Sequence, residues 1–340
     1  MKALVKFGQG RENMEIREVP EPVPGPGEIK IAVRAAGICG SDIHTMFDER
    51  KAVLPVILGH EFVGQVCAFG EGATNFRTGD WVVALPAIGG CGSCFYCRQG
   101  EYTLCEHRRS IGTHLNGAMA EYLVIPEKFA FHVPKNVADK SLMAICEPLC
   151  CAVRGIMERI EVRPNDVAVV SGPGLFGLLS LQLLKLCGAR VIVSGLPADA
   201  TRLALAAELG ADAVVTSPEA LAKRVYAENS LGADIVVEAT GAISSVHTCI
   251  DVAKKHGTYL QIAIFSRDIP FPMDDVLHKE LYVTGTNSTA VSSWKTALSL
   301  VEQERLKLEP LVSLRLPLAE WERGFDAAIE KKAYKVFLLP

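Results

Sequence analysis

The chain from about residue 152 to residue 263 alternates short β-branched runs with amphipathic stretches, and this alternation constrains the fold most. Runs such as 167–171 and 234–238 are almost wholly apolar, as is typical of strands buried on both faces of a parallel sheet. The intervening stretches, for example 175–186 and 219–228, have helical periodicity. This pattern predicts a doubly wound α/β domain with helices on both faces of its sheet.

A glycine-rich turn lies between the first predicted strand of this region and the helix that follows. It has the form G-x-G-x-x-G and consists, in order, of Gly172, Gly174, Leu175, Phe176 and Gly177, with a proline after the first glycine. The first glycine permits a tight turn, the second lets the backbone approach a pyrophosphate, and the third lets helix and strand pack closely. Phosphates would lie at the helix N-terminus, where free N–H groups favour negative charge. The strand–turn–helix context predicts dinucleotide binding rather than a plain glycine turn.

The first half of the chain has a different pattern. Short apolar or alternating runs at 29–33, 62–69 and 81–84 are separated by turns rich in proline and glycine, such as 20–27. This spacing predicts a small β-barrel or folded sheet. After residue 281 the strict strand–helix alternation is lost, and we expect the chain to return to the first domain.

Four of the eleven cysteines lie within fifteen residues. Cys91, Cys94, Cys97 and Cys105 have the spacing C-x2-C-x2-C-x7-C, which lets four thiolates surround one ion without an open position. The pattern predicts a structural zinc site. An incidental cluster of buried thiols has no packing rationale in a polar loop, and an iron–sulfur cluster would need an electron-transfer context that the chain does not offer.

A second group of metal-binding residue types lies further upstream. Cys39, His60 and Glu61 offer one thiolate, one imidazole and one carboxylate, the mixed set used where zinc keeps a position open for substrate. From spacing alone, the alternative that Cys39 and His60 are core residues stays open.

The composition excludes several classes of function. The 340 residues include 35 basic and 39 acidic side chains, a net charge of -4, without any block of like charge. Nucleic-acid and membrane-surface roles therefore have no electrostatic basis. No apolar stretch approaches the roughly 20 residues of a membrane span. We expect a soluble, cytoplasmic enzyme of about two domains that acts on a small-molecule substrate.

Taken together, the motifs resemble the zinc-dependent medium-chain dehydrogenase/reductase superfamily over essentially the whole chain. The resemblance is carried by the G-H-E of 59–61, the C-G-S-D of 39–42, the four cysteines, Glu147 with the proline after it, and the glycine-rich turn. It implies a GroES-like, β-rich catalytic domain from 1–150 and 288–340 and a Rossmann domain from 151–287. Because it combines the G-H-E motif with Glu147, the chain is similar to the polyol and threonine dehydrogenase branch of this superfamily.

The resemblance also implies roles for individual residues. Two zinc ions would be bound per chain, one in the cysteine cluster and one at Cys39, His60 and Glu61, with Glu147 as a fourth ligand in some states. Asp42 would accept a hydrogen bond from His60 and so orient the metal-bound imidazole. Ser41 would accept the proton of the substrate hydroxyl and His44 would pass it to solvent through the nicotinamide ribose, although both could be structural polar residues of a loop.

The adenosine end of the dinucleotide site departs from the family pattern. An acidic residue normally follows the second strand to bind the ribose hydroxyls, but here the strand 190–194 is followed by Gly195. Asp199 could reach the ribose or could cap the next helix. Arg202 could bind the 2′-phosphate of NADP or face solvent. Without a Ser/Arg pair after Gly195, the sequence favours NAD and leaves NADP open.

The activity implied is hydride transfer between a nicotinamide cofactor and a secondary alcohol, either a polyol or a sugar acid. The alternatives are an L-threonine 3-dehydrogenase and a catalytically silent cofactor-binding member of the superfamily. Homo-oligomerisation through the edge strands 258–263 and 282–285 is expected, with a tetramer favoured over a dimer. Candidate substrate residues are Phe47, Arg109, His114 and Asn287.

Overall fold

The computed structural model describes residues 1–265 and 267–340 and divides into two compact units. The first, here the catalytic unit, comprises Met1–Cys150, Thr289–Glu304 and Leu308–Pro340. The second, here the nucleotide unit, comprises Cys151–Ser288 and Arg305–Lys307.

The catalytic unit is built on a seven-stranded sheet in the order β15-β16-β3-β5-β6-β8, with β7 paired to β3, and a three-stranded sheet in the order β2-β1-β4. Its strands are β1 (Lys2–Lys6), β2 (Met14–Glu18), β3 (Glu28–Gly37), β4 (Val56–Ile57), β5 (Glu61–Phe69), β6 (Trp81–Ala84), β7 (Tyr122–Pro126), β8 (Ala130–His132), β15 (Val312–Pro317) and β16 (Lys335–Leu339). Its helices are α1 (Gly40–Met46), α2 (Phe95–Arg98), α3 (Cys146–Val153), which runs on into the nucleotide unit, α9 (Val291–Glu302) and α10 (Trp321–Ile329).

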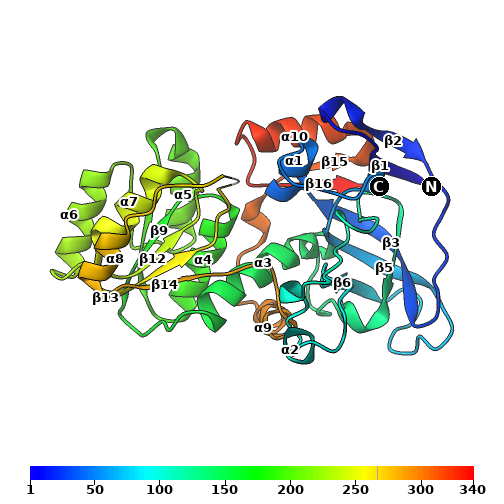
Figure 1. Ribbon diagram of the computed structural model, residues 1–340, viewed down its shortest axis with the longest axis horizontal. Coiled ribbons are helices and arrows are strands. Elements are labelled where there is room, and N and C mark those ends of the chain that lie inside the picture. The colour runs from blue at the N-terminus through cyan, green and yellow to red at the C-terminus, as the bar shows by residue number, and fades with distance from the viewer. Residues whose placement is uncertain (266) are drawn as a thin grey trace. The chain divides into compact units, whose positions relative to one another are not determined.

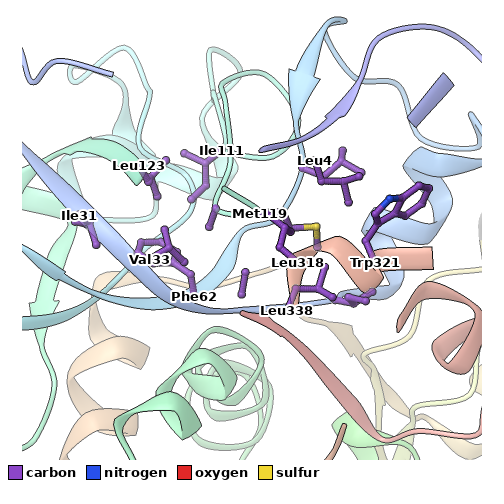
Figure 2. Close-up of a cluster of buried hydrophobic side chains, with 14 of the residues drawn as sticks. Leu4, Ile31, Val33, Phe62, Ile111, Met119, Leu123, Leu318, Trp321 and Leu338 are labelled. Carbon is purple, nitrogen blue, oxygen red and sulfur yellow. The ribbon is translucent and has the colours of Figure 1, made fainter. Parts of the chain in front are cut away.

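The main core of the catalytic unit joins segments that are far apart in the sequence. Figure 2 shows Leu4, Phe62, Met119, Trp321 and Leu338 among the side chains that meet there. Phe62 is 3% exposed and directly follows two candidate metal ligands, His60 and Glu61. Burial of a large aromatic side chain stabilises a fold by about 1.5–3 kcal/mol, so the core fixes the backbone that carries those ligands.

The nucleotide unit is a six-stranded parallel sheet in the order β11-β10-β9-β12-β13-β14. Its strands are β9 (Val167–Ser171), β10 (Arg190–Ser194), β11 (Ala213–Val215), β12 (Ala233–Glu238), β13 (Ala253–Gln261) and β14 (Tyr282–Gly285). Figure 1 shows this sheet, in green and yellow, among its helices α4 (Leu175–Leu186), α5 (Ala200–Glu208), α6 (Pro218–Glu228), α7 (Ile243–Val252) and α8 (Met273–Lys279).

This strand order, which reverses direction beside β9, is that of a dinucleotide-binding fold. Burial explains the sequence pattern, because every residue of β9 is buried and β12 is buried at all positions but one. The predicted fold class, a β-rich part plus a doubly wound parallel sheet, is confirmed.

One expectation about this sheet is wrong. The run 258–263 was expected to be an edge strand, but β13 pairs with β12 on one side and with β14 on the other. The chain leaves β13, passes through α8 and places β14 outside it. The run 282–285 does form an edge, and the opposite edge is β11.

Within the described part of the chain, no helix combines the length and apolar character that a membrane crossing requires.

Candidate functional site

Strand pairing brings the first group of candidate metal ligands together. β3 and β5 are antiparallel, and Gly37 at the end of β3 lies opposite Glu61 at the start of β5. Cys39 follows two residues after Gly37, at the N-terminus of α1, and His60 immediately precedes β5. The ligand atoms of Cys39, His60 and Glu61 consequently all lie within 4.8 Å of one another.

His60 is oriented by contacts at both ring nitrogens. Its Nδ1 is 3.5 Å from Asp42 Oδ1, and its Nε2 is 3.4 Å from Ser41 Oγ. Asp42 is itself fixed, because its Oδ2 accepts the backbone N–H of Cys39 at 2.9 Å. Burial acts to lower the pKa of His60, but the charges of Asp42 and Cys39 outweigh it and raise that pKa well above its usual value. A carboxylate at Nδ1 leaves Nε2 to face a metal, as metal-bound histidines require.

The Glu61 carboxylate lies in a fully buried ion pair. Its Oε2 is 2.5 Å from Lys335 Nζ, and that ammonium group also donates to the carbonyl oxygen of Ile38 at 2.9 Å. Glycine at position 37 leaves room for this carboxylate, since a Cβ there would lie 2.3 Å from Glu61 Oε2. The second oxygen, Oε1, is buried and has no hydrogen-bond partner among the described residues.

This donor set fits a zinc ion. A buried carboxylate oxygen without a partner is costly, and a cation beside it removes the cost. Sulfur, imidazole nitrogen and carboxylate oxygen are the three donor types of catalytic zinc, and three protein ligands leave a position for substrate. The residues therefore suit the metal that their spacing suggested.

Glu147 lies outside the group of three. Its carboxylate is buried at the start of α3 and is not among the ligand atoms that lie within 4.8 Å of one another. Its negative charge acts on Arg108, whose pKa it tends to raise.

Ser41 and His44 both lie on α1, one turn apart. The Ser41 carbonyl oxygen accepts the hydroxyl of Thr45 at 2.9 Å, and the Ser41 hydroxyl lies 3.4 Å from His60 Nε2. His44 Nδ1 is 2.5 Å from Glu49 Oε2 in the loop after the helix. The carboxylate fixes the orientation of the imidazole, so the other ring nitrogen faces away from Glu49.

The four cysteines of the second group form a compact cluster around α2. Their sulfurs lie within 4.8 Å of one another, and Cys91 Sγ is 4.0 Å from Cys97 Sγ and 3.8 Å from Cys105 Sγ. Zinc–sulfur bonds of about 2.3 Å in a regular tetrahedron place the sulfurs about 3.8 Å apart. The spacing thus matches a closed four-thiolate zinc site.

The pKa values of these thiols also favour a metal site. N–H donors from Ser93 and Cys94 lower the pKa of Cys91 to about 6, whereas burial and the neighbouring sulfurs raise the pKa of Cys97 to about 12. Four thiolates therefore do not form together without a cation among them.

The glycine-rich turn has the geometry that its sequence predicts. Gly172 has φ +103, and a Cβ on Gly177 would lie 1.9 Å from the Gly172 carbonyl oxygen. Gly174 is the N-cap residue of α4, and a Cβ there would have no neighbour closer than 3.9 Å. Leu175 and Phe176 form the first turn of α4 and are half-buried, so the backbone N–H groups of this turn are open to an anion.

At the adenosine end of the predicted dinucleotide site, Asp199 makes a local hydrogen bond. Asp199 Oδ2 accepts the backbone N–H of Leu196 at 2.9 Å, so this carboxylate caps the turn that leads into α5. Arg202, one turn into α5, points back toward the glycine-rich turn, with Nη1 3.9 Å from the position of a Cβ on Gly174. It does not simply face solvent.

Three of the four candidate substrate residues belong to the catalytic unit. Phe47 and Arg109 are exposed there and His114 is half-buried, whereas Asn287 belongs to the nucleotide unit. Sequence reasoning missed Lys335, Glu49, Arg50 and Arg108. Only Lys335 had a signal in the sequence, as a charged residue at the head of the otherwise apolar run 335–339.

Comparison with known proteins gives consistent matches. Residues 25–135 match the alcohol dehydrogenase GroES-like domain, and residues 176–303 match the zinc-binding dehydrogenase domain. The chain is 37% identical to a sorbitol dehydrogenase of Halalkalibacterium halodurans, over 100% of this chain and 99% of that protein. It is 34% identical to a D-arabitol-phosphate dehydrogenase of Enterococcus avium, over 99% of this chain and 97% of that protein.

Solved structures agree with the fold. A zinc-binding dehydrogenase from Sinorhizobium meliloti bound to NADP superposes with a TM-score of 0.90 and 32% identity, over 100% of this chain and 99% of that one.

The buried pair leads to a stability prediction. Lys335→Met leaves the Glu61 carboxylate without its ammonium partner, and breaking a buried ion pair costs about 3–5 kcal/mol. We expect a loss of this order in the free energy of unfolding, measured by urea denaturation. Lys332→Met, which removes a lysine from an exposed pair with Glu330, should change stability little. Equal stability of Lys335→Met and wild type would contradict the role given to the pair.

Proposed function

This chain belongs to the zinc-dependent medium-chain dehydrogenase/reductase superfamily, and from that premise we propose which of its residues carry the reaction. The protein is an oxidoreductase that transfers hydride between a secondary alcohol, a polyol or sugar acid, and a nicotinamide cofactor. The observation that carries the proposal is the convergence of Cys39, His60 and Glu61, together with the unpartnered buried oxygen of Glu61.

Each residue has one task in this proposal. Cys39, His60 and Glu61 hold the catalytic zinc, and Asp42 fixes the tautomer and orientation of His60. When bound, zinc supplies a Lewis acid that lowers the pKa of an alcohol, and nicotinamide supplies the hydride acceptor. The four-cysteine cluster holds a second, structural zinc, which gives two zinc ions per chain.

Two residues of α1 transfer the proton of the substrate hydroxyl to solvent. Ser41 Oγ accepts it beside His60 as it releases its own hydroxyl proton, and His44 passes the released proton on toward solvent. Glu147, a buried carboxylate of the same unit, is the proposed fourth ligand in some states.

A single substitution tests the zinc centre. Cys39→Ser removes the thiolate, and we expect turnover to be lost and zinc content to fall from about two ions per chain to about one. Metal content is measured by inductively coupled plasma mass spectrometry, and turnover by absorbance at 340 nm. Cys67→Ser, an exposed cysteine outside both groups, should retain both zinc ions and activity. Full activity of Cys39→Ser would refute the proposed mechanism.

For the cofactor, we propose that the adenosine end accepts NADP as well as NAD. Three features support this: Gly195 rather than an acid directly follows β10, the Asp199 carboxylate accepts the N–H of Leu196, and Arg202 is directed at the glycine-rich turn. An acid at the ribose is what excludes the 2′-phosphate, and a guanidinium is suited to bind it.

Arg202→Gln should therefore affect the two cofactors differently. Losing one charge-assisted hydrogen bond of about 1.5–3 kcal/mol should raise KM for NADP roughly tenfold or more, with a much smaller change for NAD. Initial rates with each cofactor measure this. Arg163→Gln is the matched control, because its side chain is exposed and paired with Glu161. An equal rise in KM for both cofactors would contradict a contact with the 2′-phosphate.

A screen of polyols, aldonates and threonine separates the main function from its alternative. Threonine turnover without polyol turnover would favour the threonine dehydrogenase reading over the one proposed here. A cytoplasmic, reducing location also remains a proposal, supported by the eleven cysteines, all of which are free thiols in the structure.

The edge strand β14 supports a homo-oligomer. Tyr282 and Val283 on this strand are exposed, and an unpaired edge with apolar side chains is a template for pairing with another chain. We expect a tetramer rather than a dimer, and multi-angle light scattering of the purified protein determines the mass. A monomeric mass would contradict both.

A further inference from the structure

The catalytic unit contains a group of basic side chains that have no role in the proposed reaction. Arg50 lies in the loop after α1, and Arg108, Arg109 and His114 lie in the loop between the four-cysteine cluster and β7. These four residues are named here the basic cluster. Arg50, Arg108 and His114 are half-buried, and Arg109 is exposed.

Backbone hydrogen bonds hold the two loops side by side and next to the candidate zinc site. The N–H of Val53 donates to the carbonyl oxygen of Thr113 at 2.8 Å. The second loop also packs directly on Gly59, because a Cβ on Gly112 would lie 2.8 Å from the Gly59 carbonyl oxygen. Gly59 immediately precedes His60. The loops that carry the basic cluster thus flank the segment that supplies two of the three proposed metal ligands.

The acids nearest to Arg50 in the sequence are engaged elsewhere. Asp48 pairs with the buried Lys6 at 3.0 Å, and Glu49 pairs with His44 at 2.5 Å. Across residues 1–265 and 267–340, no carboxylate lies at ion-pair distance from any of the three arginines. Glu106, beside them in the second loop, is exposed to solvent.

The members of the cluster act on one another electrostatically. Burial and the positive charge of Arg50 lower the pKa of Arg108, and the charge of Glu147 only partly opposes this. Burial and the charges of Arg108, Arg50 and Arg109 lower the pKa of His114. Half-buried like charges raise the energy of the free protein, and a bound anion relieves this.

We propose that the basic cluster binds an anionic terminal group of the substrate, a carboxylate or a phosphate, and so selects a sugar acid or a phosphorylated polyol over a neutral polyol. The proposal rests on the proposed function, because the anion would belong to the molecule whose hydroxyl reaches the zinc site. Planar guanidinium groups present paired N–H donors that match either kind of oxyanion. The packing of Gly112 on Gly59 connects the loop of the cluster to the segment that supplies His60 and Glu61.

Three substrates provide the test, and each of the two anions differs from sorbitol at a single terminal group. Sorbitol is neutral, D-gluconate carries a carboxylate, and sorbitol 6-phosphate carries a phosphate. With the zinc-loaded enzyme we expect kcat/KM for at least one anion to exceed that for sorbitol, and the comparison of the two anions identifies which group is bound. Arg108→Gln and Arg50→Gln should each lower kcat/KM for that anion roughly 10- to 100-fold, mainly through KM, and change sorbitol turnover less than about threefold.

Controls separate charge recognition from a loss of structure. Arg323→Gln removes the same charge from an exposed position on α10 of the same unit and should leave all three substrates unaffected. Arg108→Lys keeps the charge but not the paired donors, so it should recover part of the loss. Equal losses for sorbitol and the anions, or a wild-type preference for sorbitol, would overturn the proposal.

Titration calorimetry adds a readout that does not depend on turnover. D-gluconate and sorbitol 6-phosphate are titrated into the zinc-loaded wild type, Arg108→Gln and Arg323→Gln without nicotinamide. We expect binding of one anion to wild type and Arg323→Gln, and its loss in Arg108→Gln. If nothing is turned over with either NAD or NADP, the proposed function fails, and the titrations still decide the proposal. If neither anion binds, the basic cluster is not an anion site.

Discussion

The buried ion pair between Glu61 and Lys335 is the constraint on which the catalytic unit depends. An uncompensated carboxylate in this position would be strongly destabilising, and the lysine that compensates it comes from the last strand, β16. β16 is held by pairing with β3, which itself pairs with β5. This sheet order places one ammonium group beside one carboxylate, and the same order brings Cys39 beside His60.

The two proposed zinc sites illustrate two ways of building a metal site from a chain. The four-cysteine cluster is local: its ligands lie within fifteen residues, and backbone N–H groups of the same loop stabilise its sulfurs. The other site is long-range, because a turn, a strand pair and a distant lysine must all be in place first. A local site suits a structural role, whereas a site assembled by the whole sheet holds its ligands rigidly and leaves one side open to substrate.

The same division between local and long-range features separates what the sequence predicted from what it did not. Alternating periodicity identified the nucleotide unit, since buried parallel strands and their helices leave a local signal. Motif spacing identified Cys39 and His60 as candidate ligands. Lys335 and Arg50 escaped prediction because their importance comes from pairing and from neighbours that periodicity does not report. The strand 258–263 was wrongly expected at the sheet edge, because strand order is set by a crossover rather than by composition.

The sequence separation within the buried pair also bears on biosynthesis. Lys335 follows Glu61 by 274 residues, and the entire nucleotide unit is translated between them. A nascent chain therefore presents the Glu61 carboxylate on the ribosome before its counter-ion exists, while the intervening nucleotide unit is complete and able to fold. Formation of the Glu61–Lys335 pair thus waits for the final strand, whereas the four cysteines of the other cluster are translated together, early in synthesis.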